Sequence, residues 1–425
     1  MADSSNNFKL GFAVRSLRHR NYRLFFGGQT LSLVGTWMTQ VASSWLVYRL
    51  TSSALLLGLV SFSGQLPALL LTPFAGVWVD RWDRRTVLKV TQVLAMLESL
   101  ALAVLVFSRH ANIWYILGLT MFQGVVNAFD IPARQTFVVE MLEDRADLPN
   151  AIALNSSMMN GARLIGPSIA GAVIAVGGEL GEGYCFLIDG ISYIAVIASL
   201  MLMNTKPGIA RIHENLFSEL KAGWRYVIGY DPIRSILALI AFISLVGLPY
   251  SVLLPVFARE ILRGGPNTFG LLTGATGLGA FISAILLAMR KSIVGLGKRM
   301  AITSLTFGAA LIVFAFSQIF WLSMLLMLVV GFSMMQAIAS GNTILQTIVD
   351  EDKRGRVMSF YTLAFIGAAP IGSLFAGALA NSIGAPPTIV VCGLSCIIAS
   401  LWFFGRLENI RKIVRPLYVE RGILP

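Results

Sequence analysis

Long apolar stretches alternate with short polar gaps along the whole chain. Each stretch has about 20 residues, the length that an α-helix needs to cross a ~30 Å hydrocarbon core. A helix also satisfies its own backbone hydrogen bonds, which lipid cannot do. The pattern predicts twelve transmembrane helices, at residues 23–47, 55–79, 86–107, 112–130, 151–176, 184–203, 233–257, 268–289, 300–317, 319–341, 355–380 and 386–405.

The longest polar gap, residues 204–232, divides these helices into two sets of six. We expect one six-helix bundle at residues 23–203 and a second at 233–405, with tails at 1–22 and 406–425. Apolar residues recur within the gap at helical spacing, which predicts an amphipathic helix on the membrane surface. These apolar residues are Leu216, Phe217, Leu220, Trp224 and Val227.

The two halves also share weak sequence repeats. Ala54–Gly58 has a counterpart in Pro266–Gly270, and Gln135-Thr136 matches Gln346-Thr347 at nearly the same offset. Duplicated halves around a midplane cavity are a recurring plan of membrane transporters. The predicted fold class is therefore an all-α membrane protein built from two pseudo-symmetric six-helix bundles.

Most of the 33 Lys and Arg residues fall in alternate gaps and in the two tails. The other gaps carry only Arg49, Arg109, Arg259 and Arg263. Because cytoplasmic loops carry the excess of positive charge, both termini are predicted to be cytoplasmic. This bias and the attraction to anionic lipid explain the net charge of +12 without a nucleic-acid partner.

The composition excludes several classes of protein. With 56% hydrophobic and 13% charged residues, the chain is too apolar for a water-soluble domain. Cys185, Cys392 and Cys396 are too few for a disulfide framework or a metal site. We find no phosphate-binding loop, no zinc-ligand cluster and no pairing of a nucleophile with a base. We therefore expect no enzyme, no cofactor and no metal.

The loop after the second predicted helix combines a glycine with alternating charges: Gly76-Val-Trp-Val-Asp80-Arg81-Trp-Asp83-Arg84-Arg85. The glycine lets two helices touch, and a carboxylate can accept hydrogen bonds from Arg side chains and from a helix N-terminus. Such a charged clasp would hold the cytoplasmic side shut in one state; the alternative is a positive membrane anchor with incidental acids. The predicted gate residues are Gly76, Asp80, Arg81, Arg84 and Arg85.

This loop is similar to the signature loop of the major facilitator superfamily, with Asp83 in place of the usual glycine. Further runs resemble the branch that contains the enterobactin exporter and related bacterial efflux permeases: Pro132–Gln135, Asn150–Ser156, Asn160–Gly171 and Leu220–Val227. Part of the third run also resembles the helix 5 signature of proton-coupled drug exporters. The residues of this helix 5 motif are Asn160, Gly166, Pro167 and Gly171.

The resemblance implies a secondary transporter in the bacterial plasma (inner) membrane that works by alternating access. It implies a monomer that exports a small amphipathic molecule, siderophore-like or drug-like, with protons as possible coupling ions and membrane lipid as its surroundings. In many exporters of the superfamily an Arg precedes a Gln-Gly pair on helix 4. Here Thr120 occupies that position before Gln123-Gly124, so a proton relay would be organised differently or be absent.

Polar residues form stripes at helical spacing on the first, fourth, seventh and tenth predicted helices. Polar faces this long are costly against lipid and should face protein or water. In the superfamily that the chain resembles, these four helices line the central cavity. The alternative for each stripe is hydrogen bonding between helices, at about 0.6 kcal/mol per contact. The predicted cavity residues are Gln29, Ser32, Thr36, Gln40, Gln123, Asn127, Ser244, Ser251, Gln336, Ser340 and Arg163.

Three isolated ionisable residues lie within predicted helices, and each is a functional hypothesis by default. Arg163 either lines the pathway, where it would favour an anionic or catechol-like cargo, or pairs with Glu98 or Asp189. Glu98 and Asp189 are candidates for proton coupling. Because Glu98 lies on the third helix, away from the expected cavity helices, the alternative is a packing role.

Two other functions compete with export. A lipid or lysophospholipid flippase could use the same scaffold, and a cavity that opens sideways between the bundles would favour it. A membrane scaffold or receptor is the second alternative. It predicts that the polar stripes are filled by side chains, with no cavity between the bundles.

Overall fold

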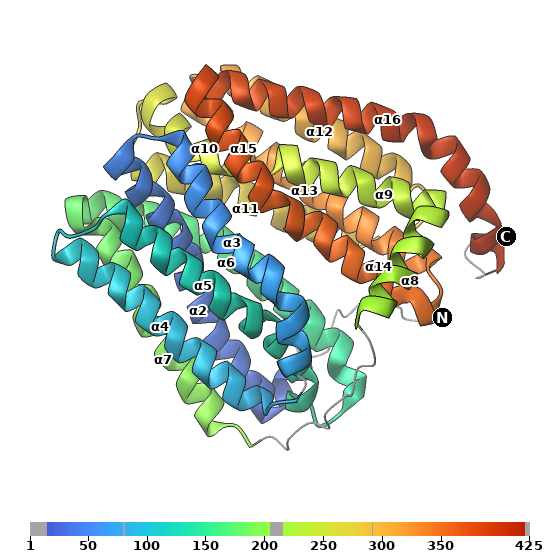
Figure 1. The fold of residues 1–425 in the computed structure, drawn as a ribbon, viewed down its shortest axis with the longest axis horizontal. Coiled ribbons are helices and arrows are strands. Elements are labelled where there is room, and N and C mark those ends of the chain that lie inside the picture. Colours follow the sequence, from blue (N-terminus) through green and yellow to red (C-terminus); the bar gives the residue numbers. More distant parts are fainter. Residues whose placement is uncertain (1–14, 80, 205–215, 291, 421–425) are drawn as a thin grey trace, which may run out of the picture.

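The computed structural model describes residues 15–79, 81–204, 216–290 and 292–420. Helices make up nearly all of these ranges, and no strand occurs in them. After a short 3₁₀ turn, six long helices form the first bundle (Figure 1). They are α2 (Arg20–Thr51), α3 (Ala54–Val79), α4 (Arg84–Phe107), α5 (Ile113–Phe137), α6 (Leu148–Gly177) and α7 (Gly181–Leu202).

The second bundle contains more helical elements because two of its long helices are interrupted. Its α-helices are α9 (Asp231–Phe242), α10 (Tyr250–Val256), α11 (Pro266–Ala288), α12 (Leu296–Phe316), α13 (Phe320–Ile348), α14 (Glu351–Thr362), α15 (Ala368–Ile383) and α16 (Ala385–Glu420). The interruptions are π turns at Ile243–Gly247, Phe257–Ile261 and Leu363–Gly367. Helices are therefore found at the predicted ranges 233–257 and 355–380, but π turns interrupt their α-helical backbone.

Two of the π turns contact each other. The Ser244 hydroxyl donates a hydrogen bond to the carbonyl oxygen of Phe365. A π turn shifts the backbone hydrogen-bond ladder by one residue, as the bond from the Leu248 N–H to the Ile243 carbonyl shows. This hydrogen bond therefore joins the two irregular helices of the second bundle at their π turns.

Local sequence explains several helix ends. The Asp83 carboxylate accepts a 2.9 Å hydrogen bond from the backbone N–H of Thr86 and so caps the first turn of α4. Asn112 caps α5 in the same way. At the other end of α5 the helix continues through Pro132 to Phe137, and α13 and α16 also extend beyond the ranges predicted from hydropathy. Polar ends of membrane helices carry no hydropathy signal, which is why the predicted ends fall short.

The predicted linker contains a helix, α8 (Leu216–Gly229). It packs on α14, where the Trp224 and Phe360 rings lie 5.8 Å apart. The ammonium group of Lys353 lies 4.9 Å from the centre of the Tyr226 ring. The described part of the linker is thus attached to the second bundle.

By length and composition, ten stretches of the described chain could cross a membrane. One of them, Leu148–Leu202, contains both α6 and α7, and α2 is not among them. The polar stripe of α2 lowers its mean hydropathy. The protein is a multi-pass membrane protein.

Figure 1 shows that the two bundles meet at one end and diverge toward the other. The diverging end, here called the basic end, is where α2, α4, α6, α9 and α12 begin and where most Lys and Arg residues lie. At the opposite end, glycines allow backbones of different bundles to touch. A Cβ on Gly171 of α6 would lie 3.1 Å from the Gly270 Cα of α11, and one on Gly377 of α15 would lie 3.0 Å from the Gly58 Cα of α3.

Candidate binding cavity

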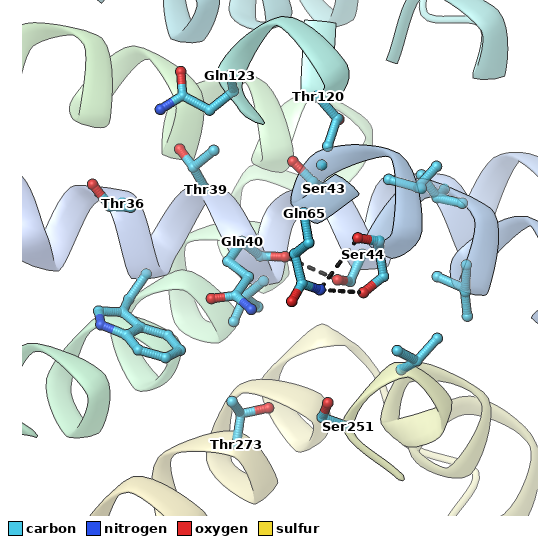
Figure 2. Close-up of a pocket in the computed structure, with 18 of the residues that line it drawn as sticks. Thr36, Thr39, Gln40, Ser43, Ser44, Gln65, Thr120, Gln123, Ser251 and Thr273 are labelled. Atoms are coloured by element: carbon cyan, nitrogen blue, oxygen red, sulfur yellow. Dashed lines mark hydrogen bonds between the residues drawn. The ribbon is translucent and has the colours of Figure 1, made fainter. Parts of the chain in front are cut away.

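A cavity of about 380 Å³ lies between the two bundles. Binding sites for small molecules start at about this size. Side chains of α2, α3 and α5 form one wall, and Ser251 and Thr273 face them from the second bundle (Figure 2). The polar residues of the lining include Thr36, Thr39, Gln40, Ser43, Ser44, Ser61, Gln65, Thr120, Gln123, Asn127, Ser251, Thr273 and Thr276.

Six of the eleven predicted cavity residues line this space, from both bundles. They are Thr36, Gln40, Gln123, Asn127, Arg163 and Ser251. The other five are not part of its lining, and all five side chains are buried: Gln29, Ser32, Ser244, Gln336 and Ser340.

Packing between neighbouring helices explains where three of these residues lie. Gln29 and Ser32 belong to the half of α2 nearer the basic end, where Gly28 and Gly35 bring α2 against α7. Gln336 of α13 accepts a 3.0 Å hydrogen bond from the Ser283 hydroxyl of α11. These polar groups lie between helices of one bundle, which is the alternative considered for each stripe.

Several residues of the lining were not predicted from the sequence. Gln65 of α3 points into the cavity, and its amide donates to the Ser61 hydroxyl at 3.0 Å (Figure 2). Thr273 and Thr276 enter from α11, and Trp37 from α2. The spacing of Ser61 and Gln65 by four residues was a weak signal for a polar face on α3. The α11 threonines stand among glycines, which are typical of close packing between helices.

Asp189 of α7 is the best anchored carboxylate in the wall. One of its oxygens accepts hydrogen bonds from the Thr39 hydroxyl of α2 and the Ser99 hydroxyl of α4, each at 2.8 Å. The other oxygen, Oδ1, is buried and has no hydrogen-bond partner in the described structure. An ideal Cβ on Gly35 would collide with this oxygen, so a glycine is needed at that position of α2.

Glu98 lies beside this group, one residue before Ser99 on α4. It is only 5% exposed, yet it contributes to the lining of the cavity together with Asp189 and Tyr193. The two proton-coupling candidates are therefore brought together on one wall, formed by α4 and α7. Glu98 therefore lines the cavity, although its position on the third predicted helix did not predict this.

Arg163 lies at the middle of α6, in the same lining. Its guanidinium carbon is 5.5 Å from the centre of the Trp37 ring. Among the described residues its guanidinium has neither an ion pair nor a hydrogen bond. The pairing of Arg163 with Glu98 or Asp189, one of the two predicted alternatives, is not present in this structure.

The predicted gate loop ties helices of the first bundle together at the basic end. Arg84 forms an ion pair with Glu140, just after α5. Arg85 donates to the carbonyl oxygens of Leu200 and Met201 at the end of α7, at 2.7 and 2.9 Å. A cation at a helix C-terminus is favourable because it meets the negative end of the helix dipole.

The other gate residues show fewer contacts. Arg81 is exposed, an added Cβ on Gly76 would touch nothing within 4 Å, and Asp80 lies outside the described residues. Asp83 serves as the cap of α4, which accounts for an acid where the superfamily signature has glycine. The loop thus has a clear structural role on its own side of the molecule.

The helix 5 motif lies on the contact surfaces of α6. Gly166 packs against α2, where an added Cβ would lie 2.6 Å from the Trp37 Cβ. Pro167 and Gly171 face α11 of the other bundle. The Asn160 amide donates to the Ser156 carbonyl one turn earlier, at 2.8 Å. The glycines and the proline of this motif therefore set how closely α6 approaches both neighbours.

The end opposite the basic end is closed by side chains of both bundles. The Tyr48 hydroxyl of α2 donates to the Glu260 carboxylate, and the Arg259 guanidinium lies 5.8 Å from the centre of the Tyr48 ring. Trp45 of α2 stacks on Phe269 of α11, with ring centres 6.2 Å apart. These contacts form a latch between the bundles on that side of the cavity.

Four features of the site bear on its chemistry. Hydroxyl groups line both walls, amide groups line the wall of the first bundle, two carboxylates lie on one side, and a guanidinium without an ion pair among the described residues lies on α6. No group of three or more His, Cys, Asp or Glu side chains that could hold a metal ion occurs within the described ranges. The arrangement is suited to hold a small polar or amphipathic molecule and to bind protons at the carboxylates.

Comparison with protein families gives a match over almost the whole chain. The family described as transmembrane secretion effector matches residues 12–412. The staphyloferrin A transporter of Staphylococcus aureus is 27% identical over 385 residues, which cover 90% of this chain and 95% of the relative. The multidrug efflux pump Tap of Mycolicibacterium fortuitum is also 27% identical, with the same coverage. Macrolide efflux protein A of Streptococcus pyogenes is 24% identical, covering 93% of this chain and 99% of its own.

Solved structures share the fold at lower identity. The nucleoside transporter NupG superimposes with a TM-score of 0.69 and 12% identity, covering 92% of this chain and 99% of NupG. A bacterial homologue of the iron transporter ferroportin, in an inward-facing state, has a TM-score of 0.70 and 17% identity, covering 91% and 98%. At these identities the likeness concerns the fold alone.

Proposed function

The chain belongs to the transmembrane secretion effector family of the major facilitator superfamily, and on this premise we propose that it exports a small amphipathic molecule by alternating access. The relatives named above are a siderophore transporter and pumps for several drugs or for macrolides. A siderophore-like or drug-like cargo is therefore the class we assign.

The cavity is the observation that carries this proposal. It lies between the bundles, takes polar side chains from both, and is closed at one end by the latch around Tyr48 and Glu260. A carrier of this type must expose one central site to the two sides of the membrane in turn. A filled centre, which the scaffold alternative predicts, does not agree with this cavity.

We assign the basic end to the cytoplasm of a bacterial cell, with both termini inside, because Lys and Arg gather there. In this orientation the bundles are apart on the cytoplasmic side and in contact on the outer side. The moving units are residues 23–203 and 233–405, joined by the linker 204–232. We count α2 as a spanning helix, which gives a set of twelve. The protein acts as a monomer and catalyses no covalent reaction.

We further propose that the proton gradient drives export through Glu98 and Asp189. A carboxylate can bind a proton in one state and release it in the other when its access to water and to neighbouring charges changes between them. Asp189 bonds to Thr39 of α2 and Ser99 of α4, so any shift among these helices changes its hydrogen bonds. Both acids line the space that the cargo occupies, which allows proton and cargo to influence each other.

The test is transport by the purified full-length protein in proteoliposomes, with and without an imposed pH gradient. The panel covers siderophores, cationic dyes and lysolipids. We expect at least one siderophore or dye to accumulate only with the gradient, and Glu98→Gln to reduce this accumulation while exchange without a gradient continues. Movement of lysolipids alone would indicate the flippase instead. If Glu98→Gln leaves the dependence on pH unchanged, its coupling role is wrong.

A further inference from the structure

We infer that Arg163 and Trp37 form a subsite that binds the anionic group of the cargo. This inference rests on the proposed function and narrows its substrate class to organic anions, with a carboxylate or a similar planar oxygen pair on an aromatic or other flat framework. It concerns one wall of the cavity, where α6 and α2 meet.

Arg163 has no counter-ion among the described residues. Three Arg side chains near helix ends of the first bundle have a carboxylate partner in the structure: Arg49 with Glu182, Arg84 with Glu140, and Arg134 with Asp130. Arg163 lies deeper than these, at the middle of α6, and has no such partner within the described ranges. A charge removed from bulk water is costly unless it is paired. An anionic cargo would supply the partner.

The indole ring of Trp37 orients the guanidinium of Arg163. A guanidinium over an indole ring, 5.5 Å from its centre, is held by a cation–π interaction. Stacking uses the face of the guanidinium and leaves the N–H donors at its edge free for a carboxylate. Gly166 keeps the Trp37 side chain close, one turn after Arg163 on the same helix. The pair is therefore organised before a ligand arrives.

The subsite lies at the seam between the two bundles. The backbone of Arg163 contacts Gly277 of α11, where an added Cβ would lie 2.6 Å from the Arg163 carbonyl oxygen. Tyr250 of α10, from the second bundle, lines the same cavity. An anion held here would touch both bundles, as a cargo that favours a change between two states must do.

The carboxylates do not neutralise this subsite. Asp189 accepts its hydrogen bonds from hydroxyl groups, and Glu98 lies on the wall formed by α4 and α7. The cavity thus has a positive site on α6 and an acidic wall on α4 and α7. Of two flat molecules of similar size, the one with a negative group should bind at Arg163, whereas a cation should not depend on it.

Two xanthene dyes provide the test, because fluorescein is an anion and rhodamine 123 a cation on the same ring system. Their binding to the detergent-solubilised full-length protein is measured by fluorescence anisotropy for the wild type, Arg163→Gln and Arg163→Lys. Arg109→Gln is the matched control, since Arg109 is an exposed residue far from the cavity whose ion pair is with Glu179. We expect Arg163→Gln to weaken fluorescein binding by about tenfold or more, as for a lost charge-assisted hydrogen bond.

Rhodamine binding should change less than the fluorescein binding, and the control should change neither. Equal losses for both dyes would mean a structural role for Arg163 and would overturn the inference, as would unchanged fluorescein binding. If Arg163→Gln does not fold, Arg163→Lys decides: a loss for fluorescein alone supports the subsite, because Lys lacks the planar fork. A failure of the proposed export function can be distinguished from a failure of this inference. In that case the wild type would transport none of the molecules in the proteoliposome panel.

Discussion

The two bundles share a helical plan but differ in where they carry charge. The first bundle has four side chains of the charged types Asp, Glu, Lys and Arg well inside its helices: Glu98, Asp130, Arg163 and Asp189. The helices of the second bundle, described throughout 235–258, 264–289, 300–349 and 357–405, have none in these ranges. They contain instead the three π turns. Charge and backbone irregularity are thus separated between the bundles.

We infer from this difference that the two bundles have different roles in transport. Glu98, Asp189 and Arg163 of the first bundle line the cavity, whereas the buried Gln336 of the second bundle accepts a hydrogen bond from Ser283 of the same bundle. Irregular helix turns often mark functional positions because they leave backbone groups unpaired and adaptable. We assign coupling to the first bundle and adjustment of the wall to the second.

The largest effect is expected from Asp189→Asn. The variant keeps the size of the side chain and its hydrogen bonds to Thr39 and Ser99 but removes the charge. Accumulation driven by the proton gradient should fall by about 100-fold, which is near the largest change that typical coupling free energies produce. Proteoliposome uptake measures it. Normal uptake by Asp189→Asn would remove the assigned difference between the bundles.

Tyr48→Phe should give the next largest effect, because it breaks the latch that joins the bundles. The lost hydrogen bond to the Glu260 carboxylate is worth about 1.5–3 kcal/mol, so the population open at that end should rise by about tenfold or more. Spin labels on either side of the latch, read as a distance distribution, report this population. Tyr22→Phe is the control, since its hydroxyl bonds within the first bundle, to the carbonyl of Ala151. An unchanged distribution in Tyr48→Phe would show that the latch does not hold the closed end.

A smaller effect is expected from pH at the basic end of the first bundle. Asp147 is buried there, and the pKa of its carboxyl is held below the ordinary value, first by the hydrogen bond from His19 and then by Arg18 and Arg15. A lowered pKa stabilises the folded state above the unfolded pKa, and this contribution is lost as the pH falls below about 4. Proteolysis at the turn Arg15–Arg18 should therefore increase below that pH. The same proteolysis in Asp147→Asn should be insensitive to acid.

The smallest effect is expected from Ser283→Ala in the second bundle. It removes one hydrogen bond to Gln336 and should lower the free energy of unfolding by about 0.6 kcal/mol, the average for contacts between membrane helices. Gradient-driven uptake should stay at the wild-type level. Thermal unfolding and uptake of one preparation separate the two effects. A loss of uptake without a loss of stability would place Ser283 in the transport pathway.

Hydropathy and helical spacing predicted the helices and six of the cavity residues. They could do so because a span has a fixed minimum length and because a polar face avoids lipid. Gln123 and Gln336 show the limit. Both stand in polar stripes of corresponding helices, yet Gln123 lines the cavity and Gln336 is buried against α11. Spacing gives the face of a helix but not the neighbour that covers it.

Other features had no signal in one sequence. The π turns depend on contacts such as that of Ser244 with the Phe365 carbonyl, which join residues far apart in the chain. Gln65 and Thr273 enter the cavity because of how α3 and α11 are rotated against their neighbours. The latch of Tyr48 and Glu260 likewise joins the two halves and follows from no local pattern.

Reactivity of a cysteine at position 251 tests the central claim most directly. Ser251 is an exposed residue of the cavity wall, and Cys185, Cys392 and Cys396 are all buried. In a variant with Ser251→Cys and the native cysteines replaced, a membrane-impermeant maleimide should react from the cytoplasmic side. Adding Tyr48→Phe should make the same thiol reactive from the outer side. A folded, transporting protein in which this thiol reacts from neither side would contradict a central cavity that opens in turn to both.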